Sequence, residues 1–254
     1  MQQLAKTTGR SHVWIRKQID EAETKTPTLI PQSIVLALDT TFWGREYGVS
    51  VLRSPNLKKN LWWQEVSQET PEVYRQGREE LEKQGWVIQG VVIDGKQGVA
   101  RVFGDIPVQL CQFHQMKTVT KYLTRKPKTQ AGWELRMITL TLARTTEIEF
   151  TTKLNAWHER WETFLSERTP CAHCKKNRWP YTHRKLRAAH RSLKTNLPLL
   201  FTYQKYPELN IPNTTNCLDG MFSQIKNRLA VHRGLREDRR YKIIGEILGG
   251  KEGN

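Results

Sequence analysis

Residues 86–114 read WVIQGVVIDGKQGVARVFGDIPVQLCQFH and predict an α/β fold. The two apolar runs in this segment, residues 87–93 and 106–110, have the length of buried strands, and each is closed by polar or turn residues. The short amphipathic segment between them predicts a crossover, so the strands would be parallel and the sheet covered on both faces by helices. Ligands of open α/β sheets bind at the carboxyl ends of strands, where Asp94 and Cys111 lie.

Composition indicates a folded, soluble chain of 254 residues, long enough for one large domain or two small ones. Hydrophobic residues make up 37% of it, and nine are Trp. No apolar run approaches the roughly 20 residues of a membrane span, and no secretory signal is present at the N-terminus. Four irregularly spaced Cys predict no disulfide framework. We therefore expect a cytoplasmic protein with no membrane partner.

Positive charge is concentrated in the middle of the chain. The formal net charge is +16, and residues 111–210 alone carry 19 basic and 7 acidic side chains, a net charge of +12. Residues 1–110 carry a net charge of only +1. A basic block within a folded sequence predicts a polyanionic partner, most simply nucleic acid; the alternative is a generally solvated basic surface.

Residues 1–20, MQQLAKTTGRSHVWIRKQID, have the spacing of a helix-turn-helix. Gly9 would form the turn and Ser11 would cap the second helix, which leaves Arg16 and Lys17 free for DNA phosphates or base edges. The chain would then begin inside the motif, without the helix that usually precedes it. The alternative is a frayed N-terminal helix.

Three further apolar runs predict the rest of the sheet. The run at residues 33–38 is followed directly by Asp39. Two further runs, at residues 48–53 and 60–66, come next, with turn residues between them. Three strands without an intervening helix predict an antiparallel meander. With a helix over residues 71–84, the order becomes β-β-β-α-β-α-β, which describes a mixed sheet.

This order, with one Asp at the end of the first strand and another at the end of the fourth, resembles the ribonuclease H-like fold. The chain resembles in particular the catalytic core of a Mutator-like bacterial insertion-sequence transposase of the DDE/D type, over roughly residues 33–245. The resemblance rests on five stretches: LALDTTFWG with Asp39, VVIDG with Asp94, CQFHQ with Cys111 and His114, NTTNCLDGMFSQIK with Asp219, and HRGL at residues 232–235.

The segment from Asn213 onward predicts a helix with an apolar stripe at Leu218, Phe222, Ile225 and Leu229. Asp219 lies in the first turn, beside the stripe, so it could face the two strand ends. A favourable interaction with the helix dipole is the other explanation for an acid at this position.

The resemblance implies a two-metal site for phosphoryl transfer. Asp39 would bridge two Mg²⁺ (or Mn²⁺) ions, with Asp94 and Asp219 each completing one site. The third acid of the family is commonly Glu, so the shorter Asp219 is a departure. The resemblance gives His114 a place beside the catalytic pocket, contacting DNA or orienting an acid, and Cys111 is expected to be packed.

The segment 115–210 predicts a basic helical insertion, since Met137, Leu140, Ile148, Leu154 and Trp157 recur at helical spacing, followed by Trp161 and Phe164. The two Trp residues are expected to form its core rather than stack on an unpaired base. A structural zinc at Cys171 and Cys174 is possible by spacing, but no second CxxC completes it, so free thiols are favoured. The residues expected to contact DNA are Arg16, Lys17, Arg184, Lys185, Arg187, Arg191, Lys226, Arg228, His232 and Arg233.

The predicted organisation has four parts: a helix-turn-helix remnant at 1–26, a linker at 27–32, a split catalytic core at 33–114 and 211–245, and the insertion at 115–210. The predicted function is a DNA transposase that cleaves transposon ends and joins the 3′-OH to target DNA in a bacterial, nucleoid-associated setting. Joining two ends implies a homodimer or larger assembly. The alternatives are an inactive or truncated relic that only binds DNA and a ribonuclease H-like nuclease.

Overall fold

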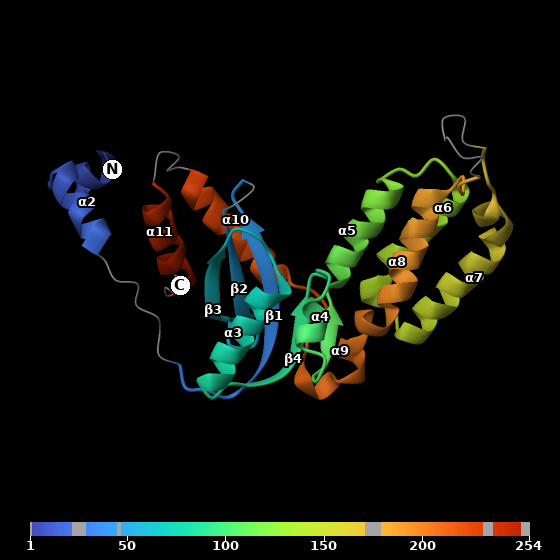
Figure 1. Ribbon diagram of the computed structural model, residues 1–254, viewed down its shortest axis with the longest axis horizontal. Coiled ribbons are helices and arrows are strands. Elements are labelled where there is room, and N and C mark those ends of the chain that lie inside the picture. The colour runs from blue at the N-terminus through green and yellow to red at the C-terminus, as the bar shows by residue number, and fades with distance from the viewer. Residues whose placement is uncertain (1, 22–28, 45–46, 171–178, 231–235, 250–254) are drawn as a thin grey trace.

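A five-stranded mixed sheet forms the centre of the protein (Figure 1). The computed structural model describes residues 2–21, 29–44, 47–170, 179–230 and 236–249, and the structural statements below concern these residues. The strands are β1 (Ser33–Phe42), β2 (Gly48–Ser54), β3 (Lys59–Val66), β4 (Val87–Ile93) and β5 (Val108–Leu110).

The strand order is β3-β2-β1-β4-β5, with β1 at the centre. β2 lies antiparallel to both β1 and β3, which confirms the predicted meander. β4 runs parallel to β1 on its other side, and β5 runs parallel to β4. The α/β class and the mixed sheet are therefore confirmed, and the arrangement is consistent with a ribonuclease H-like fold.

Alternation of side chains along β1 assigns each face of the sheet to a different pair of helices. Leu36 and Leu38 pack on the face covered by α3 (Pro71–Lys83) and α4 (Val99–Val102). Ala37 packs on the opposite face, against α10 (Asn216–Ala230) and α11 (Glu237–Gly249). Asp39 has the same parity as Ala37, so its side chain belongs to the face that α10 covers.

The described part of the chain between β5 and α10 is mainly helical, as predicted, and lies to one side of the sheet (Figure 1). Met137, Leu140 and Ile148, which indicated the helical spacing, are 42%, 42% and 79% exposed. Other apolar positions of the same helices are buried in their place. The helices are α5 (Gln112–Leu123), α6 (Gln130–Leu140), η1 (Leu142–Arg144), α7 (Glu147–Ser166), α8 (Arg184–Leu200), α9 (Thr202–Lys205) and η2 (Pro207–Leu209).

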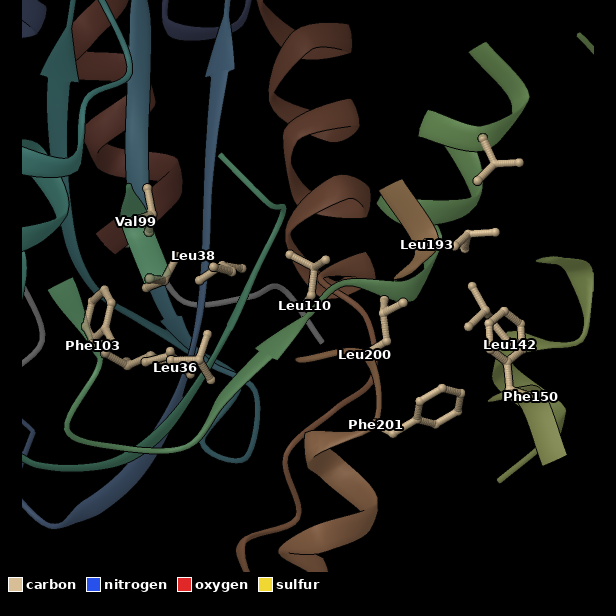
Figure 2. Packing of buried hydrophobic residues seen from close by; sticks show 14 of the residues in the cluster. Leu36, Leu38, Val99, Phe103, Leu110, Leu142, Phe150, Leu193, Leu200 and Phe201 are labelled. Carbon is tan, nitrogen blue, oxygen red and sulfur yellow. The ribbon is translucent and has the colours of Figure 1, made fainter. Parts of the chain in front are cut away.

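One apolar cluster connects the sheet to these helices (Figure 2). Leu110 at the end of β5 meets Leu200 and Phe201 at the end of α8, and Phe201 stacks near Phe150 of α7 with ring centroids 5.7 Å apart. The helical region is therefore continuous with the core of the sheet.

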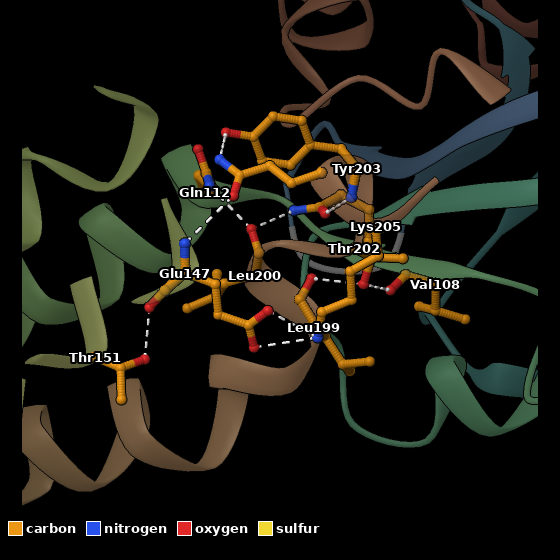
Figure 3. Close-up of polar contacts among 11 residues, drawn as sticks. Val108, Gln112, Glu147, Thr151, Leu199, Leu200, Thr202, Tyr203 and Lys205 are labelled. Carbon is orange, nitrogen blue, oxygen red and sulfur yellow. Dashed lines mark hydrogen bonds and ion pairs between the residues drawn. The ribbon is translucent and has the colours of Figure 1, made fainter. Parts of the chain in front are cut away.

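Buried amide side chains reinforce the same junction. Gln109 Nε2 and Gln112 Nε2 both donate to the carbonyl oxygen of Leu200, each at 2.9 Å. Gln109 Oε1 accepts from the backbone N–H of Tyr203 at 2.9 Å, and Thr202 Oγ1 donates to the carbonyl oxygen of Val108 (Figure 3). The end of β5 and the end of α8 are thus joined by three buried hydrogen bonds and one part-buried hydrogen bond.

The N-terminal helices α1 (Gln2–Thr8) and α2 (His12–Glu21) form a pair, with Gly9 between them at φ +65°. Ser11 Oγ accepts from the backbone N–H of Trp14, as a cap would. The pair contacts α11, because Arg239 donates to both carboxylate oxygens of Asp20 at 2.8 Å. Within the described chain, no helix is both long enough and apolar enough to cross a bilayer.

Candidate metal and nucleic-acid site

Two acids lie side by side where β1 and β4 approach their carboxyl ends. The parallel register pairs Ala37 with Val92, and two more residues along each chain place Asp39 beside Asp94. Asp39 is 8% exposed, and its Oδ1 accepts from the backbone N–H of Thr40 at 2.8 Å. Burial and the negative charge of Asp94 raise the pKa of Asp39 to about 7.

Asp219 reaches the same place from α10. This helix buries Leu218 and Phe222 against the sheet, which turns the first turn toward the strand ends. One ligand atom each of Asp39, His114 and Asp219 lie within 4.8 Å of one another. Oδ2 of Asp219 is buried and has no hydrogen-bond partner among the described residues. Such an atom is costly to leave without a partner, so it is suited to a cation.

His114 is supported by a buried cluster at the start of α5. Cys111 is fully buried, and its Sγ accepts from the backbone N–H of Thr215 at 3.3 Å and from Thr215 Oγ1 at 3.4 Å. Burial raises the pKa of the Cys111 thiol, but hydrogen bonds from His114 and Thr215 outweigh it, and the net shift is downward. The same hydrogen bond with Cys111 raises the pKa of His114. Cys111 is therefore packed, as expected, and it orients His114.

Asp94 does not belong to the closest group of ligand atoms. It is half-buried, and its Oδ1 accepts from the backbone N–H of Lys96 at 2.8 Å. Its charge is felt by Asp39, so it lies at the rim of the same site. The structure thus brings Asp39, Asp219 and His114 together, with Asp94 next to them.

A fourth acid near these residues, Glu69, carries no motif in the sequence. Its Oε1 accepts from Tyr74 Oη at 2.6 Å, and Tyr74 Oη lies 2.8 Å from Thr40 Oγ1. Its Oε2 lies 3.8 Å from Lys96 Nζ. Burial raises the pKa of Glu69, and the charge of Asp94 raises it further. Glu69 therefore connects Tyr74 and Thr40, which lie next to Asp39, with Lys96, which lies next to Asp94.

The donor set fits a divalent cation. Carboxylate oxygens are the ligands that Mg²⁺ prefers, whereas an imidazole among them suits Mn²⁺ and Zn²⁺ better. The partnerless oxygen of Asp219 and the raised pKa of Asp39 both indicate negative charge that lacks a counter-charge. The ion would be held by Asp39, Asp219 and His114, with Asp94 beside them.

The basic residues predicted to contact DNA lie on three helices. Arg16 and Lys17 are exposed on α2, although Lys17 Nζ lies 3.7 Å from Glu21. Arg187 is half-buried: it donates to the carbonyl oxygen of Leu165 at 2.9 Å and stacks on Tyr181. The remaining described ones are exposed, on α8 and α10: Arg184, Lys185, Arg191, Lys226 and Arg228. His232 and Arg233 lie outside the described residues.

Trp157 and Trp161 are core residues, as expected. Trp157 is 2% exposed and donates to the carbonyl oxygen of Ala131 at 3.0 Å. Trp161 is half-buried and donates to Glu134 at 2.9 Å. The possible zinc ligands Cys171 and Cys174 lie outside the described residues.

Comparison with known proteins was made at the level of sequence and of structure. No protein-family model and no curated protein matches the chain. Among solved structures, the Drosophila P element transposase strand transfer complex is similar to it, with 11% sequence identity and a TM-score of 0.42. The match covers 96% of this chain and 86% of that chain.

Proposed function

We propose that this chain is a metal-dependent DNA transposase, which cleaves transposon ends and joins the freed 3′-OH to target DNA. The observation that carries the proposal is the convergence of Asp39, Asp219 and His114 within 4.8 Å, beside Asp94. Each comes from a different element, and the motifs that supply them occur in the order typical of DDE/D transposases.

In this proposal Asp39 is the central ligand, because it is the most buried of the acids and lies between Asp94 and Asp219. A pair of Mg²⁺ or Mn²⁺ ions bound here would activate the attacking oxygen and stabilise the leaving oxygen. Thr40 and Tyr74 fix the backbone and the side-chain layer behind Asp39. Thr215 and Cys111 hold His114 toward the acids, where it also lies within reach of a bound DNA strand.

Exposed basic residues on α2, α8 and α10 would hold the DNA. Phosphate contacts of this kind position a duplex without reading its sequence. Arg187, which is held by Leu165 and Tyr181, would support that surface from beneath.

We further propose that residues 33–114 and 211–245 act as the catalytic unit and that residues 115–210 act as its DNA-binding insertion. Two or more copies would assemble on DNA in the bacterial cytoplasm.

Labelled DNA fragments that flank the coding sequence, incubated with supercoiled target DNA and Mg²⁺ or Mn²⁺, test the proposal. We expect nicking at a defined position followed by joining of the labelled strand, and we expect Asp39→Asn and Asp94→Ala to reduce both by about 100-fold or more. Glu79→Gln, an exposed acid on α3, is the control and should retain activity.

Three other outcomes would contradict the proposal. Cleavage without joining would identify a ribonuclease H-like nuclease. DNA binding without cleavage would identify an inactive relative. Cleavage that survives Asp94→Ala would show that the chemistry takes place elsewhere.

A further inference from the structure

The loop that follows β4 is held in place by hydrogen bonds and by close packing against α3. Asp94 Oδ1 accepts from the backbone N–H of Lys96 at 2.8 Å, and the carbonyl oxygen of Lys96 accepts from the backbone N–H of Val99 at 3.2 Å. Gly98 adopts φ +88°, and a Cβ at this position would lie 2.9 Å from Pro71 Cγ at the start of α3. The backbone of Lys96 is therefore fixed, although its side chain is 43% exposed.

Glu69 lies two residues before α3 and directs its carboxylate at the same loop. Its Oε1 accepts from Tyr74 Oη at 2.6 Å, and Tyr74 is 1% exposed. Only 13% of the Glu69 side chain is exposed, so the carboxylate is anchored from the buried side. Its Oε2 lies 3.8 Å from Lys96 Nζ. That distance is an ion pair and is longer than a hydrogen bond, so the N–H donors of Lys96 remain available to a ligand.

The pair formed by Glu69 and Lys96 lies on the Asp94 side of the acid site. Burial raises the pKa of Glu69, the negative charge of Asp94 raises it further, and the charges of Lys96 and His114 lower it. The carboxylate of Glu69 is thus within electrostatic reach of two residues of the site. Asp94 itself stands outside the closest group of ligand atoms. Lys96 therefore supplies a positive charge beside the acid that this group does not include.

Phosphoryl transfer makes use of such a charge. In the proposed cleavage step, a water oxygen forms a bond to phosphorus while the bond from phosphorus to the 3′ oxygen breaks. The water gives a proton to solvent, and the 3′ oxygen takes one from solvent and leaves as the 3′-OH. Negative charge is spread over the non-bridging oxygens during the transfer, and a donor in a fixed position stabilises it. An ammonium has three N–H donors and no acceptor, so Lys96 can bind such an oxygen without gaining or losing a proton.

We propose that Lys96 binds a non-bridging oxygen of the phosphate that is cleaved, and that Glu69 is a positioning residue that holds Lys96 there. The proposal rests on the function proposed above, because that function supplies the phosphate. A free Lys side chain loses considerable rotamer entropy when it binds a ligand. The ion pair with Glu69 restricts Lys96 beforehand, so less of this entropy is lost when the phosphate arrives.

Cleavage kinetics with the labelled DNA fragments described above and Mn²⁺ test Lys96. We expect Lys96→Gln to lower kcat about 100-fold and to change KM by less than about threefold, because the contact is strongest in the transition state. Lys96→Arg keeps the positive charge and should recover activity to within about tenfold of the wild type. The matched control, Lys83→Gln, removes the same charge from an exposed position at the end of α3 and should stay within about twofold.

Glu69→Gln tests the positioning role. The variant keeps an oxygen that can accept from Tyr74 Oη but has no charge to hold Lys96, and it should lower kcat about tenfold. In the Lys96→Gln background the same change should lower kcat by less than about twofold, because Glu69 then has no ammonium to position. Additive losses would show that Glu69 acts by another route. Thermal unfolding of every variant checks that each remains folded.

A second measurement needs no cleavage. Bound Mn²⁺ speeds the phosphorus NMR relaxation of a phosphate close to it, so a titration of the Mn²⁺-loaded protein with inorganic phosphate measures how tightly the site holds a phosphate. We expect Lys96→Gln to weaken this affinity about threefold to tenfold and Lys83→Gln to leave it within about twofold. The affinity for Mn²⁺ alone should change by less than about threefold in Lys96→Gln, because Lys96 is not a ligand of the ion.

The outcomes separate this proposal from the proposed function. A wild type that never cleaves DNA, together with weaker phosphate binding by Lys96→Gln, would refute the transposase and keep the phosphate contact. Phosphate binding by Lys96→Gln at the wild-type affinity would refute the contact, whether or not the wild type cleaves DNA. Equal losses of cleavage in Lys96→Gln and Lys96→Arg would also overturn it, because the positive charge would then not be what matters.

Discussion

Asp39 is the acid of the site whose pKa is raised to about 7 by its surroundings. It is buried, it faces two other carboxylates, and its pKa lies at about 7 rather than near 3.8. A folded-state pKa above the unfolded value means that the folded chain retains its proton over the interval between them. The stability that protonation gives is therefore fully present below about pH 4 and is lost as the pH rises toward 7.

We predict that Asp39→Asn stabilises the metal-free protein at pH 8 by an amount on the order of 2–4 kcal/mol and has little effect at pH 4. Asn keeps an oxygen that can accept from Thr40 but carries no charge. Thermal unfolding in EDTA at both pH values measures the effect. Added Mn²⁺ should raise the melting temperature of the wild type and not that of the variant; an equal response of both would place the ion elsewhere.

The junction of β5 with α5 and α8 depends on buried amides rather than on apolar packing alone. Gln109 alone makes hydrogen bonds with Leu110, Leu200 and Tyr203. We predict that Gln109→Leu destabilises the fold by about 1–3 kcal/mol, because the part-buried backbone N–H of Tyr203 and the buried carbonyls of Leu110 and Leu200 each lose a hydrogen bond. Urea unfolding measures this. Gln64→Leu, at an exposed position of β3, should stay within about 0.5 kcal/mol of the wild type. Equal stability of Gln109→Leu and wild type would show that the amides contribute nothing to the junction.

The sequence predicted the strands and helix α10 well, because buried runs such as residues 87–93 and the stripe from Leu218 to Leu229 are local patterns. It also suggested that Asp219 could face the strand ends that carry Asp39 and Asp94, with an interaction with the helix dipole as the alternative. It did not predict that Glu69 lies near the site. That position depends on contacts of Glu69 with Tyr74 and Lys96, which only the folded chain brings together. The amide of Gln109 and the carbonyl of Leu200 lie 91 residues apart in the chain, and no local pattern reports such a pairing.

The helical region shows the same limit in another form. Met137, Leu140 and Ile148 satisfy helical spacing, yet they face solvent because the neighbouring helices pack against the other side of α6 and α7. Periodicity identifies an apolar stripe but does not say which stripe meets a partner. For the same reason, the basic character of α8 could be read from the sequence, whereas the separate role of Arg187 could not.

The two ends of the described chain meet, since α2 contacts α11 through Asp20 and Arg239. We predict that Asp20→Ala speeds hydrogen exchange of backbone amides in α2 by up to about fivefold without affecting the sheet, because a solvent-exposed ion pair stabilises a structure only slightly. Glu21→Ala, which removes a partner only within α2, is the control. An unchanged exchange rate in Asp20→Ala would mean that the helix pair is held by other contacts.

The position of Asp219 so late in the chain bears on how the protein is made. A ribosome synthesises Asp39, Asp94 and His114 between 180 and 105 residues before it reaches Asp219. Until α10 emerges, the sheet face that carries Ala37 and Val92 lacks the helix that covers it. A nascent chain interrupted in the helical region therefore displays an apolar surface that chaperones and proteases recognise, and it lacks one of the acids of the proposed metal site.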